Sequence, residues 1–116
     1  MDGRLFEDYL KRLLQWRGYN VRLTKTSGDY GADLILSANG KTIIVQAKRY
    51  KNKVGLKAVQ EIVSAKNIYH ADECWVITNN YFTAPAINLV NANDVVLIDR
   101  DELIHWMIMM KDAQRA

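Results

Sequence analysis

Residues 31–48 read GADLILSANGKTIIVQAK, two apolar runs separated by an Asn-Gly pair. Asn-Gly is the strongest short signal for a β-hairpin, because both central residues of a type I′ turn need φ > 0. If Asn39 and Gly40 form a two-residue turn, the register of the two strands follows. The predicted pairs are Ala38–Lys41, Leu36–Ile43, Leu34–Val45 and Asp33–Gln46. A four-residue loop would keep the faces but shift the pairing by two, which would separate Asp33 from Gln46.

The two faces of this hairpin differ in chemistry. Successive side chains of a strand point to opposite faces. One face is predicted to carry Asp33, Ile35, Gln46 and Lys48, and the other Ala32, Leu34, Ile43, Val45 and Ala47. The polar side chains therefore gather on one face, at the end of the hairpin away from the turn. A carboxylate, a second oxygen ligand and a lysine placed together can hold a metal ion and polarise a phosphate.

The composition of the chain is that of a globular protein with a substantial core. Its 116 residues predict a single domain, 1–116, either complete or taken from a longer protein, and 49% of them are hydrophobic. The net charge of +3 is compatible with an anionic partner. The single cysteine, Cys74, excludes an internal disulfide framework and indicates a reducing, cytoplasmic location. No apolar run approaches the roughly 18–20 residues of a membrane span, so we expect no membrane contact.

Periodicity and turn signals predict an alternation of helices and strands. Apolar residues at helical spacing predict a helix over residues 2–17, which Gly18 ends. Thr83 is expected to cap a short helix, and Asp99 with Glu102 resembles a capping box before the last one. The other expected elements are strands at 19–23, 32–37, 41–48, 73–79 and 95–98 and a helix over 56–70. The order α-β-β-β-α-β-α-β-α predicts a mixed sheet with helices on both faces.

An ordered set of motifs resembles one protein family. The motifs are Phe6-Glu7, Gly18-Tyr19-x-Val21, Ser27-Gly28-Asp29-x-Gly31-Ala32-Asp33-Leu34, Val45-Gln46-Ala47-Lys48-Arg49-Tyr50, Ile77-Thr78-Asn79, Phe82-Thr83-x-x-Ala86 and Leu97-Ile98-Asp99. The set resembles the Mrr-type catalytic domain, a branch of the PD-(D/E)xK nuclease superfamily related to type IV restriction enzymes and archaeal Holliday-junction resolvases. The resemblance covers residues 3–104 and implies an α/β fold with the restriction-endonuclease-like core, whose order is α-β-β-β-α-β.

The resemblance also implies roles for residues on the hairpin and on two helices. Asp33 occupies the position of the invariant acid, and Lys48 that of the lysine. Gln46 stands where most of the superfamily has Asp or Glu, a departure that the Mrr-like branch commonly carries and that removes one negative charge. Glu7 matches a first-helix acid that helps to hold the metal in related nucleases. Gln60 falls on the helix after the lysine strand, where relatives often place a polar residue near the active site.

These residue types suit metal-assisted hydrolysis of a phosphodiester. Mg²⁺, or Mn²⁺ in its place, prefers oxygen ligands. The expected ligands are the carboxylates of Asp33 and Glu7, the side-chain carbonyl of Gln46 and the backbone carbonyl of Ala47. Lys48 would lie near the scissile phosphate, where it orients the water or neutralises developing charge.

Several of these residues also have an ordinary structural explanation. Glu7 has Lys11 four residues further on, which is a favourable surface pair on a helix. Gln46 could simply hydrogen-bond the backbone, and Gln60 could face solvent. Asp29, a secondary candidate, lies in a Ser-Gly-Asp-x-Gly loop and is more typical of a turn former than of a ligand.

A basic cluster follows the lysine strand. We expect DNA contacts from Arg49, Tyr50, Lys51, Lys53 and Lys57. Cationic contacts to phosphates give affinity without sequence information. The alternative is a group of lysines that is merely solvated. No helix-turn-helix, zinc finger or other reader of base edges is evident in the sequence.

The main functional hypothesis is a metal-dependent DNA endonuclease of the Mrr-like restriction or DNA-processing type. One alternative is a structure-selective nuclease like a Holliday-junction resolvase. Another is a non-catalytic DNA-binding module on the same fold, which Gln46 keeps open. The last helix carries six apolar residues between Ile104 and Met110 and is apolar nearly all round. Such a helix buries more than one face, which makes a homodimer or contact with an adjoining domain plausible.

Overall fold

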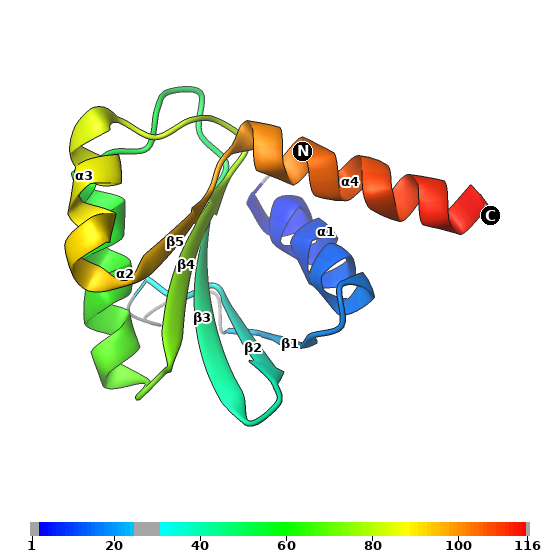
Figure 1. Ribbon diagram of the computed structural model, residues 1–116, viewed down its shortest axis with the longest axis horizontal. Coiled ribbons are helices and arrows are strands. Elements are labelled where there is room, and N and C mark those ends of the chain that lie inside the picture. The colour runs from blue at the N-terminus through cyan, green and yellow to red at the C-terminus, as the bar shows by residue number, and fades with distance from the viewer. Residues whose placement is uncertain (1–2, 25–30, 116) are drawn as a thin grey trace.

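The computed structural model describes residues 3–24 and 31–115, in which helices cover both faces of a five-stranded sheet (Figure 1). The helices are α1 (Gly3–Trp16), α2 (Leu56–Ile68), α3 (Ala84–Asn93) and α4 (Arg100–Arg115). The strands are β1 (Asn20–Leu23), β2 (Leu34–Ala38), β3 (Lys41–Lys48), β4 (Glu73–Thr78) and β5 (Val95–Ile98). They lie in chain order across the sheet, antiparallel from β1 to β3 and parallel from β3 to β5. The predicted element order and mixed sheet are confirmed.

The hairpin between β2 and β3 has the predicted two-residue turn. Asn39 and Gly40 have φ angles of 54° and 79°, and the ladder runs from Ala38–Lys41 to Leu34–Val45. This register excludes the four-residue loop. The expected Asp33–Gln46 pair is not part of the ladder, because Asp33 lies just before β2. Its backbone N–H still donates to the Val45 carbonyl at 2.7 Å, which keeps Asp33 beside β3.

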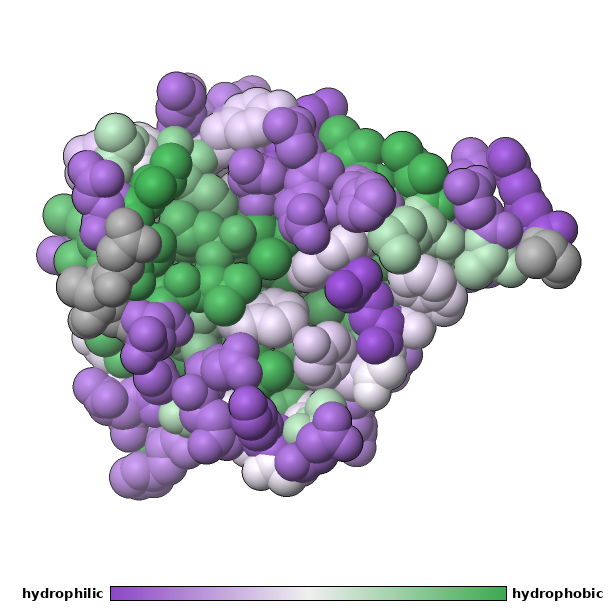
Figure 2. All heavy atoms as spheres, in the orientation of Figure 1, coloured by the Kyte–Doolittle hydropathy of each residue, from purple (hydrophilic) through white to green (hydrophobic). Residues whose placement is uncertain are grey.

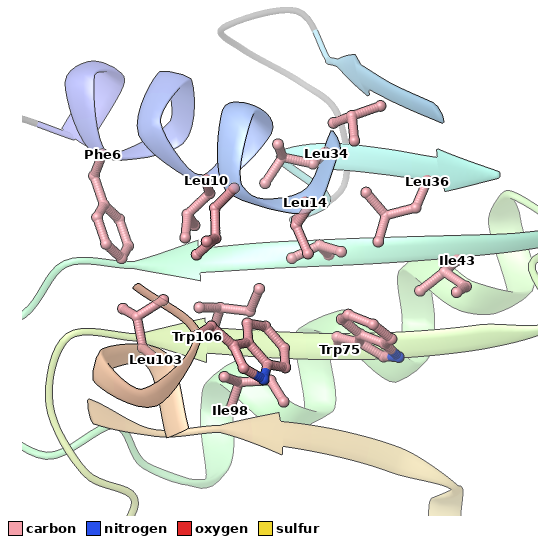
Figure 3. Close-up of a cluster of buried hydrophobic side chains, with 14 residues drawn as sticks. Phe6, Leu10, Leu14, Leu34, Leu36, Ile43, Trp75, Ile98, Leu103 and Trp106 are labelled. Carbon is pink, nitrogen blue, oxygen red and sulfur yellow. The ribbon is translucent and has the colours of Figure 1, made fainter. Parts of the chain in front are cut away.

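Helices α1 and α4 cover one face of the sheet. Figure 3 shows Phe6, Leu10 and Leu14 of α1 pointing toward the strands, with Leu103 and Trp106 of α4 nearby. Their buried partners on the strands are Leu34, Leu36, Ile43, Val45, Trp75, Ile77 and Ile98. This contact explains the helical spacing of apolar residues in α1, since those positions form the stripe that faces the sheet.

Helices α2 and α3 cover the other face. Their core contains Ile35, Ile44, Val54, Ala58, Val59, Ile62, Ala65, Cys74, Val76 and Ala86. Strands β3 and β4 therefore bury side chains on both faces, which explains the uninterrupted apolar run in β4. Ala32 also lies in this core, so its predicted place on the face of Leu34 was wrong. Ala32 precedes the ladder and follows Gly31, whose φ is 88°, and the alternation of a strand does not extend that far.

The predicted caps mark the helix ends. Thr83 Oγ1 accepts from the Ala86 N–H at 3.3 Å, and Asp99 Oδ1 accepts from the Glu102 N–H at 3.1 Å. Helix α4 packs through Leu103 and Trp106. Other apolar residues of α4, Ile104, Ile108 and Met109, are exposed, and Figure 2 shows hydrophobic surface over this helix. Helix α4 thus has apolar residues on most of its sides, as expected, but only one side is buried against the rest of this chain.

Candidate active site

Asp33 lies just before β2, with its carboxylate fixed against β3. The Ala47 N–H donates to Asp33 Oδ2 at 2.8 Å. The backbone of Asp33 is held on both sides, because its N–H donates to the Val45 carbonyl and its own carbonyl accepts from the Thr24 N–H at 3.0 Å. The carbonyl of Ala32, the residue before it, accepts from the Thr24 hydroxyl at 2.8 Å instead of from β3. The Asp33 side chain thus accepts from the Ala47 N–H, which has no partner in the β2–β3 ladder because the ladder ends at Leu34–Val45.

The Gln46 side chain projects from β3 toward α2. Its side chain is 2% exposed. Its Nε2 donates to Glu61 Oε2 on α2 at 3.1 Å. Gln46 Oε1 is buried and has no hydrogen-bond partner among the residues that the structure describes. Such an atom costs free energy unless something binds it.

Gly31 forms one wall of the space around this pair. A Cβ atom at position 31 would lie 3.3 Å from Gln46 Nε2 and 3.6 Å from Glu61 Oε2. The φ angle of 88° also favours glycine at this position. A side chain at position 31 would therefore crowd Gln46 Nε2 by a few tenths of an ångström, in addition to the strain of the positive φ angle.

Glu7 reaches the same end of the hairpin from α1. Burial raises the pKa of Glu7 above its usual value of 4.5, and the neighbouring charge of Asp33 raises that pKa further. Arg4 partly opposes this shift through an ion pair of 3.2 Å with Glu7. The contribution of Asp33 to this shift reflects repulsion between the two carboxylates.

The donors in this region fit a hard divalent cation. Within residues 3–24 and 31–115, no three His, Cys, Asp or Glu side chains form a metal-binding group. The available oxygens are those of two carboxylates, Asp33 and Glu7, the buried amide oxygen of Gln46 and the carbonyl of Ala47. That carbonyl points to the Asp33 side of β3, because the N–H and C=O of one residue in an extended strand face the same edge. Carboxylate and carbonyl oxygens are ligands that Mg²⁺ accepts.

Lys48 is held at the end of β3 by Tyr50. Its Nζ donates to the Tyr50 hydroxyl at 3.2 Å and lies 5.2 Å from the centroid of the Tyr50 ring. Tyr50 itself is 45% exposed. The sequence predicted Tyr50 only as a DNA contact, whereas this geometry makes it the residue that orients the ammonium group of Lys48.

Polar residues at the end of β4 fix the chain that carries Lys48 and Tyr50. The Thr78 hydroxyl donates to the Lys48 carbonyl at 2.6 Å. Asn79 Oδ1 accepts from the Tyr50 N–H at 2.8 Å, and Asn80 Nδ2 donates to the Tyr50 carbonyl at 3.3 Å. The Ile77-Thr78-Asn79 motif therefore acts as a brace for the lysine strand, a role that the sequence did not reveal.

The basic cluster divides between two sides of the molecule. Lys51, Lys53 and Lys57 are exposed. Arg49 is also exposed, but it lines a largely apolar pocket of about 260 Å³ together with Phe6, Tyr9 and residues of α4. This pocket lies on the side of α1 and α4, whereas Gln46 faces α2. The pocket is therefore separate from the surroundings of Gln46.

One residue of this region, Glu61, was not predicted from the sequence. Gln60 is exposed, and the contact with Gln46 comes from its neighbour Glu61. Asp29 lies outside the described residues. Glu61 had a signal in the sequence, because it is three residues after Ala58 and four before Ala65, both buried. That spacing predicts a carboxylate on the helix stripe that faces the sheet.

The Mrr_cat family model, described as a restriction endonuclease, matches residues 1–107. This chain belongs to the Mrr_cat restriction endonuclease family. The resemblance of the hairpin motifs to the Mrr-type catalytic domain is thereby confirmed. A search of curated proteins found no match for the Mrr_cat chain. No helix in its described part is long and apolar enough to cross a membrane.

Solved structures share the fold of the Mrr_cat chain. The DNA modification-dependent restriction endonuclease AspBHI is 21% identical to it, with a TM-score of 0.73 over 88% of this chain and 30% of AspBHI. The MspJI restriction endonuclease, solved in complex with a 27-mer oligonucleotide, is 22% identical, with a TM-score of 0.65 over 88% of this chain and 27% of MspJI. A repair endonuclease from Pyrococcus abyssi is 15% identical, with a TM-score of 0.63 over 85% of this chain and 47% of that one. The Mrr_cat chain thus has the restriction-endonuclease fold and spans less than half of each of these three proteins.

Proposed function

We propose that this Mrr_cat chain is a metal-dependent DNA endonuclease that hydrolyses phosphodiester bonds, of the Mrr-like restriction or DNA-processing type. One observation carries the proposal: a carboxylate, Asp33, is bonded to β3 at Ala47, and the preceding residue of β3, Gln46, has a buried oxygen without a partner among the described residues. A cation coordinated by the Asp33 carboxylate and by Gln46 Oε1 would offset the cost of burying Oε1.

Four residues of the chain would hold Mg²⁺ or Mn²⁺. They are Asp33, Glu7, Gln46 through Oε1 and Ala47 through its carbonyl. When bound, the cation supplies Lewis acidity toward the phosphate and makes the attacking water more acidic. Asp33 keeps its carboxylate in place through its bond to Ala47. Glu7 would contribute as a carboxylate, and burial and the charge of Asp33 disfavour that ionised form, since they raise the pKa of Glu7.

Lys48 is proposed to contact the scissile phosphate. Its ammonium group carries a positive charge and three donors. The hydrogen bond from Nζ to the Tyr50 hydroxyl limits the rotamers that the Lys48 side chain samples before DNA binds. A preorganised cation at this position stabilises negative charge that develops on the phosphate oxygens.

Exposed cations beside the proposed centre are suited to the DNA backbone. Lys51 and Lys53 lie on the connector after β3, and Lys57 lies in the first turn of α2. These lysines would neutralise phosphates and would give affinity without reading sequence. Arg49 would serve a different stretch of backbone, because it faces the pocket between α1 and α4.

Cleavage assays on defined DNA test this proposal. Duplex, single-stranded, nicked, methylated and four-way-junction DNA are each incubated with the chain and Mg²⁺ or Mn²⁺. We expect cleavage of at least one form, lost in Asp33→Ala and Lys48→Ala and retained in Lys111→Ala, an exposed site on α4. No cleavage of any form, or cleavage that survives Asp33→Ala and Lys48→Ala, would overturn the proposal.

The same assays separate the two alternative functions. A preference for four-way junctions over duplex would indicate a structure-selective nuclease of the resolvase type. Salt-dependent DNA binding without cleavage, and without Mn²⁺ binding in calorimetry, would indicate the non-catalytic module. The neutral side chain of Gln46 is the feature of this chain that favours that second alternative, because it offers an amide oxygen in place of a carboxylate.

Two further parts of the proposal concern the setting of this domain. We place it in the cytoplasm, where its single cysteine, the buried Cys74, stays reduced. We also propose that Ile104, Ile108 and Met109 of α4 contact a second copy or an adjoining domain, since all three are exposed. Light scattering of the parent and of Ile108→Lys tests the second copy; a monomer at all concentrations would exclude it.

A further inference from the structure

The contact between Gln46 and Glu61 has a direction. A carboxylate is only an acceptor, whereas a glutamine side chain has a donor end and an acceptor end. The Glu61 carboxylate therefore selects the NH₂ end of Gln46, to which it is bonded at 3.1 Å. The other end, Oε1, is buried and has no partner in the described part of the chain.

We infer that Glu61 is a positioning residue, whose carboxylate holds the Gln46 amide with its oxygen free for the cation. This inference rests on the proposed function. With the amide turned over, Gln46 would present two N–H donors to the cation and would repel it. An amide alone has little preference between the two orientations, so the helix carboxylate is what makes a neutral residue usable as a ligand.

Gly31 and the burial of Gln46 support this role. Gln46 is 2% exposed, so no bulk water competes for its NH₂ group. The backbone of Gly31 closes the space beside Nε2 and Glu61 Oε2, where even a Cβ atom would lie at 3.3 Å and 3.6 Å. The pair is thus confined on three sides, by β3, by α2 and by Gly31, and has little freedom to exchange partners.

The role differs from that of a direct ligand, and substitutions can separate the two. Glu61→Ala removes the acceptor and the charge, whereas Glu61→Gln removes the charge and keeps an acceptor of the same size. The double variant Gln46→Glu/Glu61→Gln exchanges the two groups, so the hydrogen bond and the total charge are both kept. The single variant Gln46→Glu instead places two carboxylates side by side.

Mn²⁺ titration by calorimetry, without DNA, tests the inference on the full chain. We expect Glu61→Ala to weaken Mn²⁺ binding by about 10- to 100-fold, as the loss of an outer partner of a metal ligand typically does. Glu61→Gln should recover most of that loss, and the double exchange should bind Mn²⁺ more tightly than Gln46→Glu alone. Ser64→Ala, on the exposed side of α2, should bind like the parent.

A second measurement does not depend on the metal. In the NMR spectrum of the free protein, the side-chain NH₂ resonances of Gln46 should be protected from exchange, and Glu61→Ala should abolish that protection while a thermal melt verifies that the variant folds. Parent-like Mn²⁺ binding by Glu61→Ala would overturn the inference, as would an equal loss in Glu61→Gln and Glu61→Ala. If the parent binds Mn²⁺ and cuts DNA but Glu61→Ala and Glu61→Gln bind Mn²⁺ equally well, only the inference fails. If the parent neither binds Mn²⁺ nor cuts DNA, the proposed function fails as well.

Discussion

Gly31 lies directly against the side-chain amide of Gln46, since a Cβ atom at position 31 would lie 3.3 Å from Nε2. The backbone before β2 thus lies against the face of β3 that is turned toward α2. The proposed centre includes this contact, because the same Gln46 side chain carries the buried oxygen Oε1. Each element of this geometry can be tested by substitution.

Gly31→Ala should destabilise the fold more than Gly40→Ala. Both positions have positive φ, 88° and 79°, so an alanine at either one costs about 1–2 kcal/mol in backbone strain. Only position 31 adds crowding against Gln46 and Glu61, whereas the space around position 40 is open. Chemical denaturation measures the difference, and equal losses at the two positions would show that the crowding is relieved without cost.

Asp33→Asn should separate the charge of Asp33 from its structural contact. The introduced amide keeps an oxygen that accepts from the Ala47 N–H, so the melting temperature should stay close to that of the parent. Loss of the carboxylate should lower the cleavage rate on the order of 10²-fold or more. Asp33→Ala should add a loss of about 1–3 kcal/mol in stability, because the Ala47 N–H is then left unpaired.

Asp112 is exposed on α4, so Asp112→Asn removes one negative charge far from the hairpin and serves as the control for Asp33→Asn. Its cleavage rate and melting temperature should match those of the parent. A parent-like cleavage rate for Asp33→Asn itself would contradict the role of the carboxylate.

Glu7→Gln should stabilise the metal-free protein at neutral pH. The raised pKa of Glu7 means that the folded state holds its proton more tightly than the unfolded state does. Stability is therefore lost as the pH rises through the usual value of 4.5 and then through the raised folded value. A glutamine cannot ionise, so its advantage should be absent well below pH 4.5 and should grow toward neutral pH.

Thermal melts in EDTA across this pH range measure the effect of Glu7→Gln, and Glu102→Gln, an exposed site on α4, is the matched control. Saturating Mn²⁺ should reverse the order, since the cation stabilises the ionised parent. A gain that does not change with pH would contradict the raised pKa of Glu7.

Tyr50→Phe should reduce turnover without a comparable loss of DNA affinity. The substitution keeps the ring beside Lys48 and removes the hydroxyl that accepts from Nζ. A net hydrogen bond of about 0.5–1.5 kcal/mol corresponds to a rate loss of roughly 2- to 10-fold. Tyr81→Phe removes a hydroxyl that bonds Asp101 instead, and its kcat should be unchanged. An equal effect of both substitutions would argue against a role for Tyr50 in orienting Lys48.

Lys51→Ala, Lys53→Ala and Lys57→Ala should each weaken DNA binding most at low salt. The slope of log K against log salt is negative, and the loss of one phosphate contact makes it less steep by about 0.9. Fluorescence anisotropy in EDTA, which prevents cleavage, gives these slopes. Lys111→Ala should leave the slope unchanged, and a parent-like slope in all three variants would mean that these lysines are only solvated.

The hairpin and its register could be predicted because they depend on short-range signals. Asn39 and Gly40 adopt the positive φ angles of a type I′ turn, and the alternation from Leu34 to Ala38 fixes the faces. Ala32 was placed wrongly because it lies outside the ladder, where backbone turns replace strand geometry. Period two applies only while the strand continues.

The contacts within the candidate site could be predicted only in part. The motif brought Asp33, Gln46 and Lys48 to the same end of the hairpin. It did not predict that Asp33 bonds the Ala47 amide, that Tyr50 holds Lys48 or that Glu61 bonds Gln46. The Glu61 contact depends on the angle at which α2 packs on the sheet, and the other two depend on side-chain rotamers; a motif contains no information on either.

The bond between Asp33 and Ala47 also provides a spectroscopic probe. Most strand amides donate to a neutral carbonyl, but the Ala47 amide donates to a carboxylate. The chemical shift of that one backbone proton therefore responds to the charge on Asp33. A single resonance of the main chain reports protonation and cation capture, with no label introduced into the site.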